Sequence, residues 1–196
     1  MRIAGIVLAA GAGRRAGGPK ALLTLEGGSF LARALSLLSR PGVDTVCAVL
    51  GHEAARVERE AGPLPPADIL TNADYESGML SSLLRGLEHA EAKGADAILV
   101  HPVDHPRVAP DTVDRVIAAL REGARIAVPS WSGRRGHPGG FARETWPMLR
   151  AAPPERGARA VLADHPDWVV HVEGDAGCTT GVNTPEDYER IVRWSR

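Results

Sequence analysis

A glycine-rich loop that carries three cations follows an apolar segment near the start of the chain. Residues 8–20 read LAAGAGRRAGGPK and come directly after the apolar run 3–7. Glycines let backbone N–H groups turn toward a bound anion without obstruction by side chains. Arg14, Arg15 and Lys20 add the positive charge that attracts phosphates. The loop therefore predicts a binding site for the triphosphate of a nucleotide.

The same loop also fits the fingerprint G-x-G-x-x-G/A of dinucleotide-binding folds, through Gly11, Gly13 and Ala16. That fingerprint expects a helix to open at the loop and an acidic residue about 20 residues later. The Gly-Gly-Pro sequence of 17–19 disfavours such a helix, and the first acid after the next predicted strand is Glu53. An NAD-dependent oxidoreductase is therefore disfavoured. An ordinary glycine-rich turn with solvated cations is the other alternative.

The loop resembles the signature of nucleotidyltransferases with a glycosyltransferase-A-like fold, and most closely that of the molybdenum-cofactor cytidylyltransferases. Four further segments resemble that family's motifs in the same order along the chain: 72–83, 101–106, 133–138 and 184–188. The resemblance implies that a nucleoside triphosphate binds here. The residues that it assigns to the nucleotide are Leu8, Ala9, Ala10, Gly11, Gly13, Arg15, Lys20, Gly78 and Ser82.

Asp104 stands beyond a predicted buried strand, between prolines, and the resemblance makes it a ligand of Mg²⁺. Without the resemblance, a turn-forming aspartate is an equal alternative. His101 and His105 raise the question of zinc, but a third firm ligand is not spaced nearby, so we expect them to be loop or substrate-facing residues. Arg15, Lys20 and Asp104 are the residues that the resemblance implies for catalysis.

The segment before the last helix departs from the family pattern. The cytidylyltransferases have aspartates at the positions of Gly181 and Asn183. An Asn side chain still offers a carbonyl oxygen to Mg²⁺, and sugar-1-phosphate uridylyltransferases resemble this chain there. We therefore expect Asn183 to be the second metal ligand, and a helix cap is its structural alternative. The lost aspartates leave the acceptor open and keep a non-catalytic nucleotide-binding protein as an alternative.

Several further residues have both a functional and a structural interpretation. Arg135 and His137 lie in a polar loop where an arginine could hold the phosphate of an acceptor, and a solvated turn is equally compatible. Trp131 nearby could stack on a flat heterocycle. Ser82, which the resemblance makes a base contact, would on sequence alone be expected to cap a helix together with Ser81.

The expected reaction is attack of an acceptor phosphate on the α-phosphorus of the triphosphate, with release of pyrophosphate. A phosphate nucleophile, with a second pKa near ~6, needs no general base at neutral pH. Ala10 indicates the base, because relatives with Leu-Ala-Ala-Gly tend to use CTP and those with Leu-Ala-Gly-Gly tend to use GTP. The expected acceptor is a molybdopterin-type phosphate, and another phosphorylated alcohol or sugar is the alternative.

The composition sets limits on the protein's class. The 196 residues have the length of one domain, 1–196, with a formal net charge of −1 and no basic stripe, so a nucleic-acid-binding surface is not expected. A hydrophobic run of transmembrane length is not found, and a strand begins almost at Met1, so a cytoplasmic protein without membrane contact is expected. Cys47 and Cys178 do not form a disulfide framework.

Apolar runs alternate with helical patterns along the chain. Strands are predicted at 3–8, 45–50, 68–70, 97–101, 125–129 and 168–172. Helices are predicted at 30–39, 53–60, 79–91, 111–121, 156–163 and 185–193, the last with Thr184 as N-cap. Such alternation predicts a three-layer α/β/α Rossmann-like fold around a mainly parallel, mixed sheet. The glycine loop and Asp104 then share the carboxyl edge of the sheet, where ligands bind.

Overall fold

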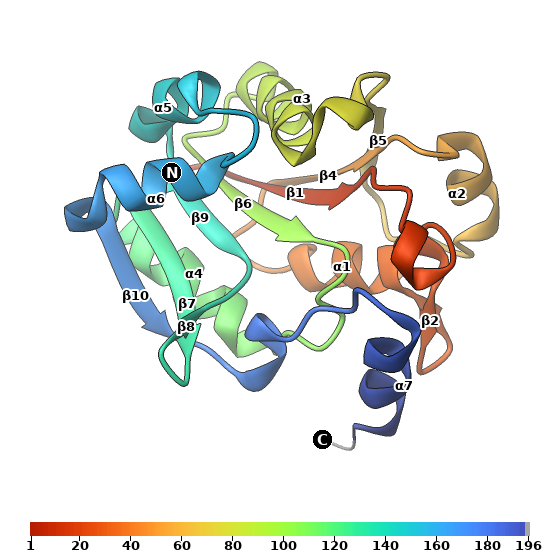
Figure 1. The fold of residues 1–196 in the computed structure, drawn as a ribbon. Helices are drawn as coiled ribbons and strands as arrows, with labels where there is room; N and C mark the ends of the chain where they lie inside the picture. Colours follow the sequence, from red (N-terminus) through yellow and green to blue (C-terminus); the bar gives the residue numbers. More distant parts are fainter. Residues whose placement is uncertain (195–196) are drawn as a thin grey trace.

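A twisted eight-stranded sheet forms the centre of the molecule (Figure 1), in a computed structural model that describes residues 1–194. Its strand order is β10-β7-β9-β6-β1-β4-β5, and β8 pairs with β7. The strands are β1 (Ile3–Ala9), β4 (Thr45–Leu50), β5 (Asp68–Thr71), β6 (Ala97–Pro102), β7 (Ile126–Trp131), β8 (Arg134–Arg135), β9 (Gly139–Ala142) and β10 (Val169–Glu173). A separate two-stranded hairpin consists of β2 (Thr24–Leu25) and β3 (Gly28–Ser29).

The sheet is mainly parallel, as the sequence predicts. β1 runs parallel to both β4 and β6, and β10 runs parallel to β7. Two strands are exceptions: β9 lies antiparallel between β6 and β7, and the short β8 pairs antiparallel with β7. β1 is buried along its whole length, which explains why its sequence is a continuous apolar run rather than an alternating one.

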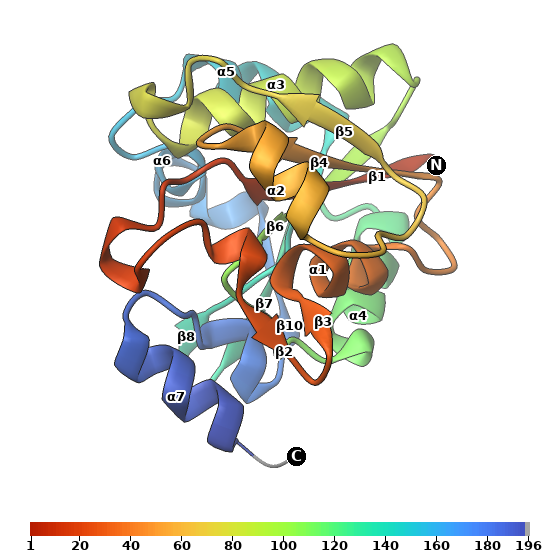
Figure 2. The ribbon, with the colours of Figure 1, turned by 90° about the vertical axis from the view of Figure 1, so that its right-hand side faces the viewer.

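Helices cover both faces of the sheet. They are α1 (Phe30–Leu38), α2 (Ala54–Glu60), α3 (Met79–Ala92), α4 (Pro110–Arg121), α5 (Trp146–Ala151), α6 (Ala158–Asp164) and α7 (Pro185–Arg193). One apolar core joins α1 and α4 to the sheet, and the other joins α3, α5 and α6 to its opposite face (Figure 2). The predicted three-layer α/β/α architecture is therefore confirmed. None of the helices within residues 1–194 is long and apolar enough to cross a membrane.

Helix ends follow the capping chemistry of the sequence. The Ser29 hydroxyl accepts a hydrogen bond from the N–H of Ala32 at the start of α1. Thr184 and Asp187 form a reciprocal capping box at the start of α7, which confirms the predicted N-cap. α7 is held against the β2–β3 hairpin, since the Tyr188 hydroxyl donates to the carbonyl of Thr24 at 2.7 Å. This places the segment before α7 beside the loops of the carboxyl edge (Figure 2).

Candidate active site at the carboxyl edge

The glycine loop leaves β1 and turns through two positive-φ glycines. Gly13 has φ 59° and Gly17 has φ 85°, on either side of a three-residue 3-10 turn. The carbonyl of Gly13 accepts hydrogen bonds from Ala16 and Gly18, and a Cβ at position 13 would lie 1.9 Å from the Gly18 oxygen. Because the loop closes on its own backbone, only glycine fits at position 13. The long helix that a dinucleotide-binding fingerprint requires after β1 is replaced by this short turn.

Lys20, Asp104 and Asn183 meet in one cluster, although they are far apart in the sequence. The Lys20 ammonium donates to Oδ2 of Asp104 at 2.7 Å and to Oδ1 of Asn183 at 2.8 Å. The side chains of Lys20 and Asp104 are 18% and 21% exposed, so the cluster is half-buried at the rim of the sheet. The backbone N–H of Val182 donates to the Asp104 carbonyl at 2.9 Å and fixes the two loops together.

This cluster has the donor set of a small hard cation. The ammonium of Lys20 already lies between a carboxylate oxygen and an amide oxygen, which shows that a cation is accommodated there. Oxygen ligands of this kind suit Mg²⁺, which keeps several waters and bonds to substrate phosphate. Within residues 1–194 no group of three or more His, Cys, Asp or Glu side chains is arranged to hold a metal. A metal here therefore depends on the amide oxygen of Asn183.

The cations of the loop differ in exposure. Arg14 and Arg15 are exposed on the 3-10 turn, whereas Lys20 is anchored to Asp104. An exposed arginine has the freedom to fold over a phosphate that binds in the loop. The expected triphosphate residues thus lie together in the loop that follows β1.

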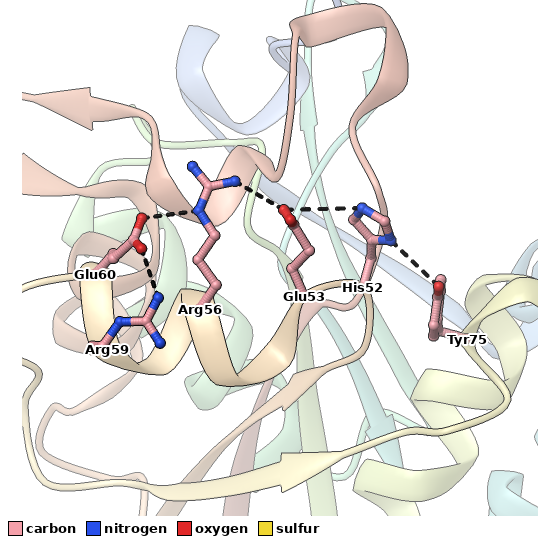
Figure 3. A network of polar contacts seen from close by, with 6 residues as sticks. All are labelled: His52, Glu53, Arg56, Arg59, Glu60 and Tyr75. Atoms are coloured by element: carbon pink, nitrogen blue, oxygen red, sulfur yellow. Dashed lines mark hydrogen bonds and ion pairs between the residues drawn. The ribbon is translucent and has the colours of Figure 1, made fainter.

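Two residues outside the expected site, His52 and Tyr75, border the same loop. The backbone N–H of His52 donates to the carbonyl of Ala10 at 2.9 Å. The His52 ring lies 3.3 Å from the Tyr75 hydroxyl through Nδ1, and Figure 3 shows both rings beside the arginine–glutamate chain on α2. A Cβ at Gly51 would lie 2.5 Å from Tyr75 and 2.9 Å from the methyl group of Ala10. Three loops therefore close tightly around Ala10. Tyr75 belongs to the family-like segment 72–83, but its contact with His52 cannot be predicted from either local sequence.

Gly78 precedes α3, and Ser82 lies in its first turns. Ser82 is 3% exposed, and its hydroxyl accepts a hydrogen bond from the Asn72 amide at 3.0 Å. Ser81 accepts from the same amide and donates to backbone carbonyls. The expected capping role is wrong, because Gly78 is the N-cap residue of α3 and no side chain caps this end. A base contact by Ser82 remains a prediction, since a hydroxyl that accepts one hydrogen bond can still donate another.

A cleft of about 770 Å³ opens beside the glycine loop. Leu8 and Gly78 border it on the nucleotide side, and Arg135 and His137 border it on the other. Its floor is apolar and its rim is cationic: the floor includes Leu83, Val100 and Phe141, and the rim adds Arg156 and Arg159, with Glu155 as the one carboxylate among the lining residues. The structure thus brings the two residues expected at an acceptor into the same cleft as two of the residues expected at the nucleotide.

Three histidines gather between the cleft and the lysine cluster. The rings of His105 and His137 are in edge contact at 4.7 Å between centroids. Burial, and after it the charge of the neighbouring His105, lower the pKa of His137 to about 3. Burial also lowers the pKa of His105, although Asp104 partly offsets this effect. Both imidazoles are therefore neutral at pH 7.

His101 corrects one expectation. It is fully buried in β6 rather than being a loop or substrate-facing residue. Neither of its ring nitrogens has a hydrogen-bond partner in the described part of the chain. Burial lowers its pKa well below the usual value, with His105 and His137 as further causes. A histidine in the apolar sequence of a strand signals burial, and the strand extends to Pro102, one residue beyond the predicted end.

Comparison with known proteins agrees with this geometry. The family of MobA-like NTP transferase domains matches residues 5–169. A "nicotine blue oxidoreductase" of Paenarthrobacter nicotinovorans is 36% identical and covers 97% of this chain and 96% of its own. A "probable molybdenum cofactor guanylyltransferase" of Mycobacterium ulcerans is 31% identical over 97% and 94% of the two chains.

A solved structure shows the same fold. The protein Rv0371c of Mycobacterium tuberculosis, crystallised in complex with manganese, superposes with a TM-score of 0.77 at 28% identity over 98% of both chains. The family match covers most of the chain. The chain belongs to the MobA-like NTP transferase family and is a nucleotidyltransferase.

Proposed function

We propose that this protein transfers a nucleoside monophosphate from a nucleoside triphosphate to a phosphorylated small molecule and releases pyrophosphate. The observation that carries the proposal is the meeting of Lys20, Asp104 and Asn183 beside the glycine loop. Cation-binding oxygens and phosphate-binding N–H groups lie on the same edge of the sheet there. This is the combination that in-line displacement at phosphorus needs, because catalysis depends on alignment and neutralisation of charge.

The acceptor phosphate attacks the α-phosphorus, and the bond from that phosphorus to the bridging oxygen of the leaving pyrophosphate breaks. The attacking phosphate is ionised at neutral pH because its second pKa is ~6, so no side chain has to take a proton. Arg15, Lys20 and the loop N–H groups hold the triphosphate. Asp104 and Asn183 would hold a divalent ion, Mg²⁺ in the first instance, which neutralises the phosphate charge. A manganese complex of a structural relative supports the use of a divalent ion.

CTP is the proposed nucleotide. The methyl group of Ala10 is only 6% exposed and lies against the tight junction of Gly51 and Tyr75. Relatives with Leu-Ala-Ala-Gly tend to use CTP and those with Leu-Ala-Gly-Gly tend to use GTP, and Ala10 gives this chain the first pattern. GTP is the second candidate, and the name of the guanylyltransferase relative favours it.

A molybdopterin-type phosphate is the proposed acceptor, and another phosphorylated alcohol or sugar is the alternative. The cleft supports a ligand with an apolar body and an anionic group, since its floor is apolar and its rim carries Arg135, Arg156 and Arg159. Guanidinium groups bind phosphate in a bidentate manner. His137 is neutral and offers a hydrogen bond rather than a charge.

A nicotinamide-dependent oxidoreductase is a second candidate function. The relative named nicotine blue oxidoreductase favours it. The short turn after β1 does not supply the helix N-terminus that a dinucleotide pyrophosphate uses. This candidate expects NADH or NADPH to bind, and a nucleotidyltransferase does not require that.

One experiment tests the proposal directly. Purified protein is incubated with Mg²⁺, molybdopterin and each of the four triphosphates, and released pyrophosphate is measured. We expect release with CTP and little with the others. Release with GTP alone would replace the base assignment. Triphosphate binding without any release would support the non-catalytic alternative, and raised thermal stability with NADH alone would support the oxidoreductase.

A further inference from the structure

The imidazole of His105 lies directly beside the proposed metal-binding oxygens. Its Nε2 is 3.8 Å from Oδ1 of Asp104, and its side chain is only 14% exposed. The other oxygen of the same carboxylate, Oδ2, is the one bonded to Lys20. His105 therefore faces one oxygen of Asp104 while the cation-holding position faces the other.

The space for this ring exists because residue 181 has no side chain. A Cβ at Gly181 would lie 3.0 Å from Nε2 of His105 and 3.4 Å from its Cε1. Gly181 is also two residues before Asn183, the other oxygen donor of the cluster. The ring of His105 is thus enclosed between Asp104 and the backbone that presents Asn183.

The separation suits a shared metal ion. Bonds from Zn²⁺ or Mg²⁺ to nitrogen or oxygen ligands are about 2.0–2.1 Å, so one ion can span donors up to about 4.2 Å apart. The 3.8 Å between Nε2 and Oδ1 is within that span. Nδ1 of His105 is buried, and the backbone of Gly177 and Cys178 lies close enough to the ring to act on its pKa by hydrogen bonding. A metal-bound histidine commonly donates its other N–H to a backbone carbonyl, so these neighbours are compatible with a bond from Nε2 to a metal.

We propose that Nε2 of His105 is a third protein ligand of the metal, together with Asp104 and Asn183. The ion binds the Asp104 carboxylate through Oδ1, the oxygen that faces His105, and takes Oδ1 of Asn183 from Lys20, which turns to the phosphates. An imidazole nitrogen favours first-row transition metals, whereas Mg²⁺ prefers oxygen ligands throughout. With His105 as a ligand, the site should therefore bind Mn²⁺, Fe²⁺ or Zn²⁺ more tightly than Mg²⁺, the ion proposed from the two oxygen donors alone. This inference rests on the proposed function for the position of the metal.

Electron paramagnetic resonance of bound Mn²⁺ tests the proposal. The full chain is loaded with Mn²⁺ and inorganic pyrophosphate, a phosphate ligand that contains no nitrogen. We expect pulsed measurements to show coupling to a directly bound nitrogen, and we expect it to change from a ¹⁴N to a ¹⁵N pattern in protein labelled with ¹⁵N only in histidine. In addition, Mg²⁺ should displace Mn²⁺ less readily from the wild type than from His105→Gln.

The variants assign the nitrogen to one residue. We expect the coupling to be lost in His105→Gln and to persist in His137→Gln, whose ring contacts His105 but not the oxygens. Gly181→Ala is a second variant, in which the added methyl group crowds Nε2 and should weaken the coupling. Coupling that survives in His105→Gln, or that is lost in both histidine variants, would overturn the assignment.

The outcome for the wild type separates this inference from the proposed function. Bound Mn²⁺ without histidine-dependent coupling overturns the His105 ligand and leaves the nucleotidyl transfer intact. A wild type that binds no Mn²⁺ removes the metal site together with this inference. Pyrophosphate release from a triphosphate, measured on the same preparation, reports on the proposed function separately.

Discussion

We expect triphosphate binding to depend most directly on Lys20. Its ammonium lies at the mouth of the glycine loop, bonded to Asp104 and Asn183. Lys20→Ala should weaken triphosphate binding by about 1.5–3 kcal/mol, the range for a hydrogen bond to a charged group. Isothermal titration calorimetry measures this. The control is Lys93→Ala, since Lys93 is an exposed lysine paired with Asp68 away from the loop. Equal affinity in the wild type and Lys20→Ala would remove the loop assignment.

The oxygen ligands can be tested by exchanging their charges. Asp104→Asn keeps the shape of the side chain and removes its charge, so pyrophosphate release should fall below detection while the unfolding midpoint changes little. Asn183→Asp adds a negative charge at the second oxygen and should strengthen divalent metal binding. Metal titration and circular dichroism measure the two effects. An active Asp104→Asn variant, or weaker metal binding by Asn183→Asp, would contradict the site.

The sequence predicts the glycine loop from its local composition, and the family resemblance adds Asp104 and Asn183 as expected metal ligands. The structure brings Lys20, Asp104 and Asn183 within hydrogen-bond distance, and their roles stay predictions. The proximity of His52 and Tyr75 to Ala10 cannot be predicted locally, because it arises from the packing of three separate loops. The burial of His101 is not predicted, because its polar side chain stands at the end of an apolar run.

At the scale of elements, the sequence predicts the alternation of strands and helices, because a buried parallel strand is a continuous apolar run and an amphipathic helix has a helical period of apolar residues. The sequence does not predict β9 and α5. β9 begins with Gly139 and Gly140, which carry no strand signal, and it is antiparallel in a parallel neighbourhood. α5 is a six-residue helix with a proline in its first turn. Trp168 was assigned to a strand, but it lies in a 3-10 turn, and β10 begins at Val169.

The capping box of α7 supports the position of Asn183. The Asp187 carboxylate accepts hydrogen bonds from the backbone N–H groups of Asn183 and Thr184. Thr184→Ala should cost about 1 kcal/mol of unfolding free energy, the usual value for loss of an N-cap. Urea unfolding measures this, with Thr180→Ala in the preceding loop as the comparison. A change within ±0.5 kcal/mol in Thr184→Ala would show that the cap does not hold α7 in place.

The same box makes stability depend on pH. The hydrogen bond from the Asn183 backbone is the largest cause that holds the pKa of Asp187 below its usual value. A carboxyl group whose folded pKa is lowered stabilises the fold above its unfolded pKa of about 3.9, and this stabilisation is lost as the pH falls through the folded value. Asp187→Asn should therefore be more destabilising at about pH 7 than at about pH 3.5. Urea unfolding at both pH values measures this, and an equal effect would contradict the pKa direction.

At the scale of the molecule, we expect the nucleotide and the acceptor to bind to different groups of loops at the carboxyl edge of the sheet. Arg135 and His137 line the cleft, whereas Arg15 and Lys20 are not among its lining residues and Lys20 is bonded to Asp104. Arg135→Ala should therefore leave triphosphate affinity nearly unchanged and lower turnover with the acceptor, because the guanidinium is exposed on β8 rather than in the loop. Calorimetry with CTP and pyrophosphate release at varied acceptor concentration measure the two effects. The exposed Arg134 on the same strand is the matched control. If triphosphate binding collapsed in Arg135→Ala but not in Arg134→Ala, the cleft would belong to the nucleotide, and the acceptor would have to enter from the side of α7.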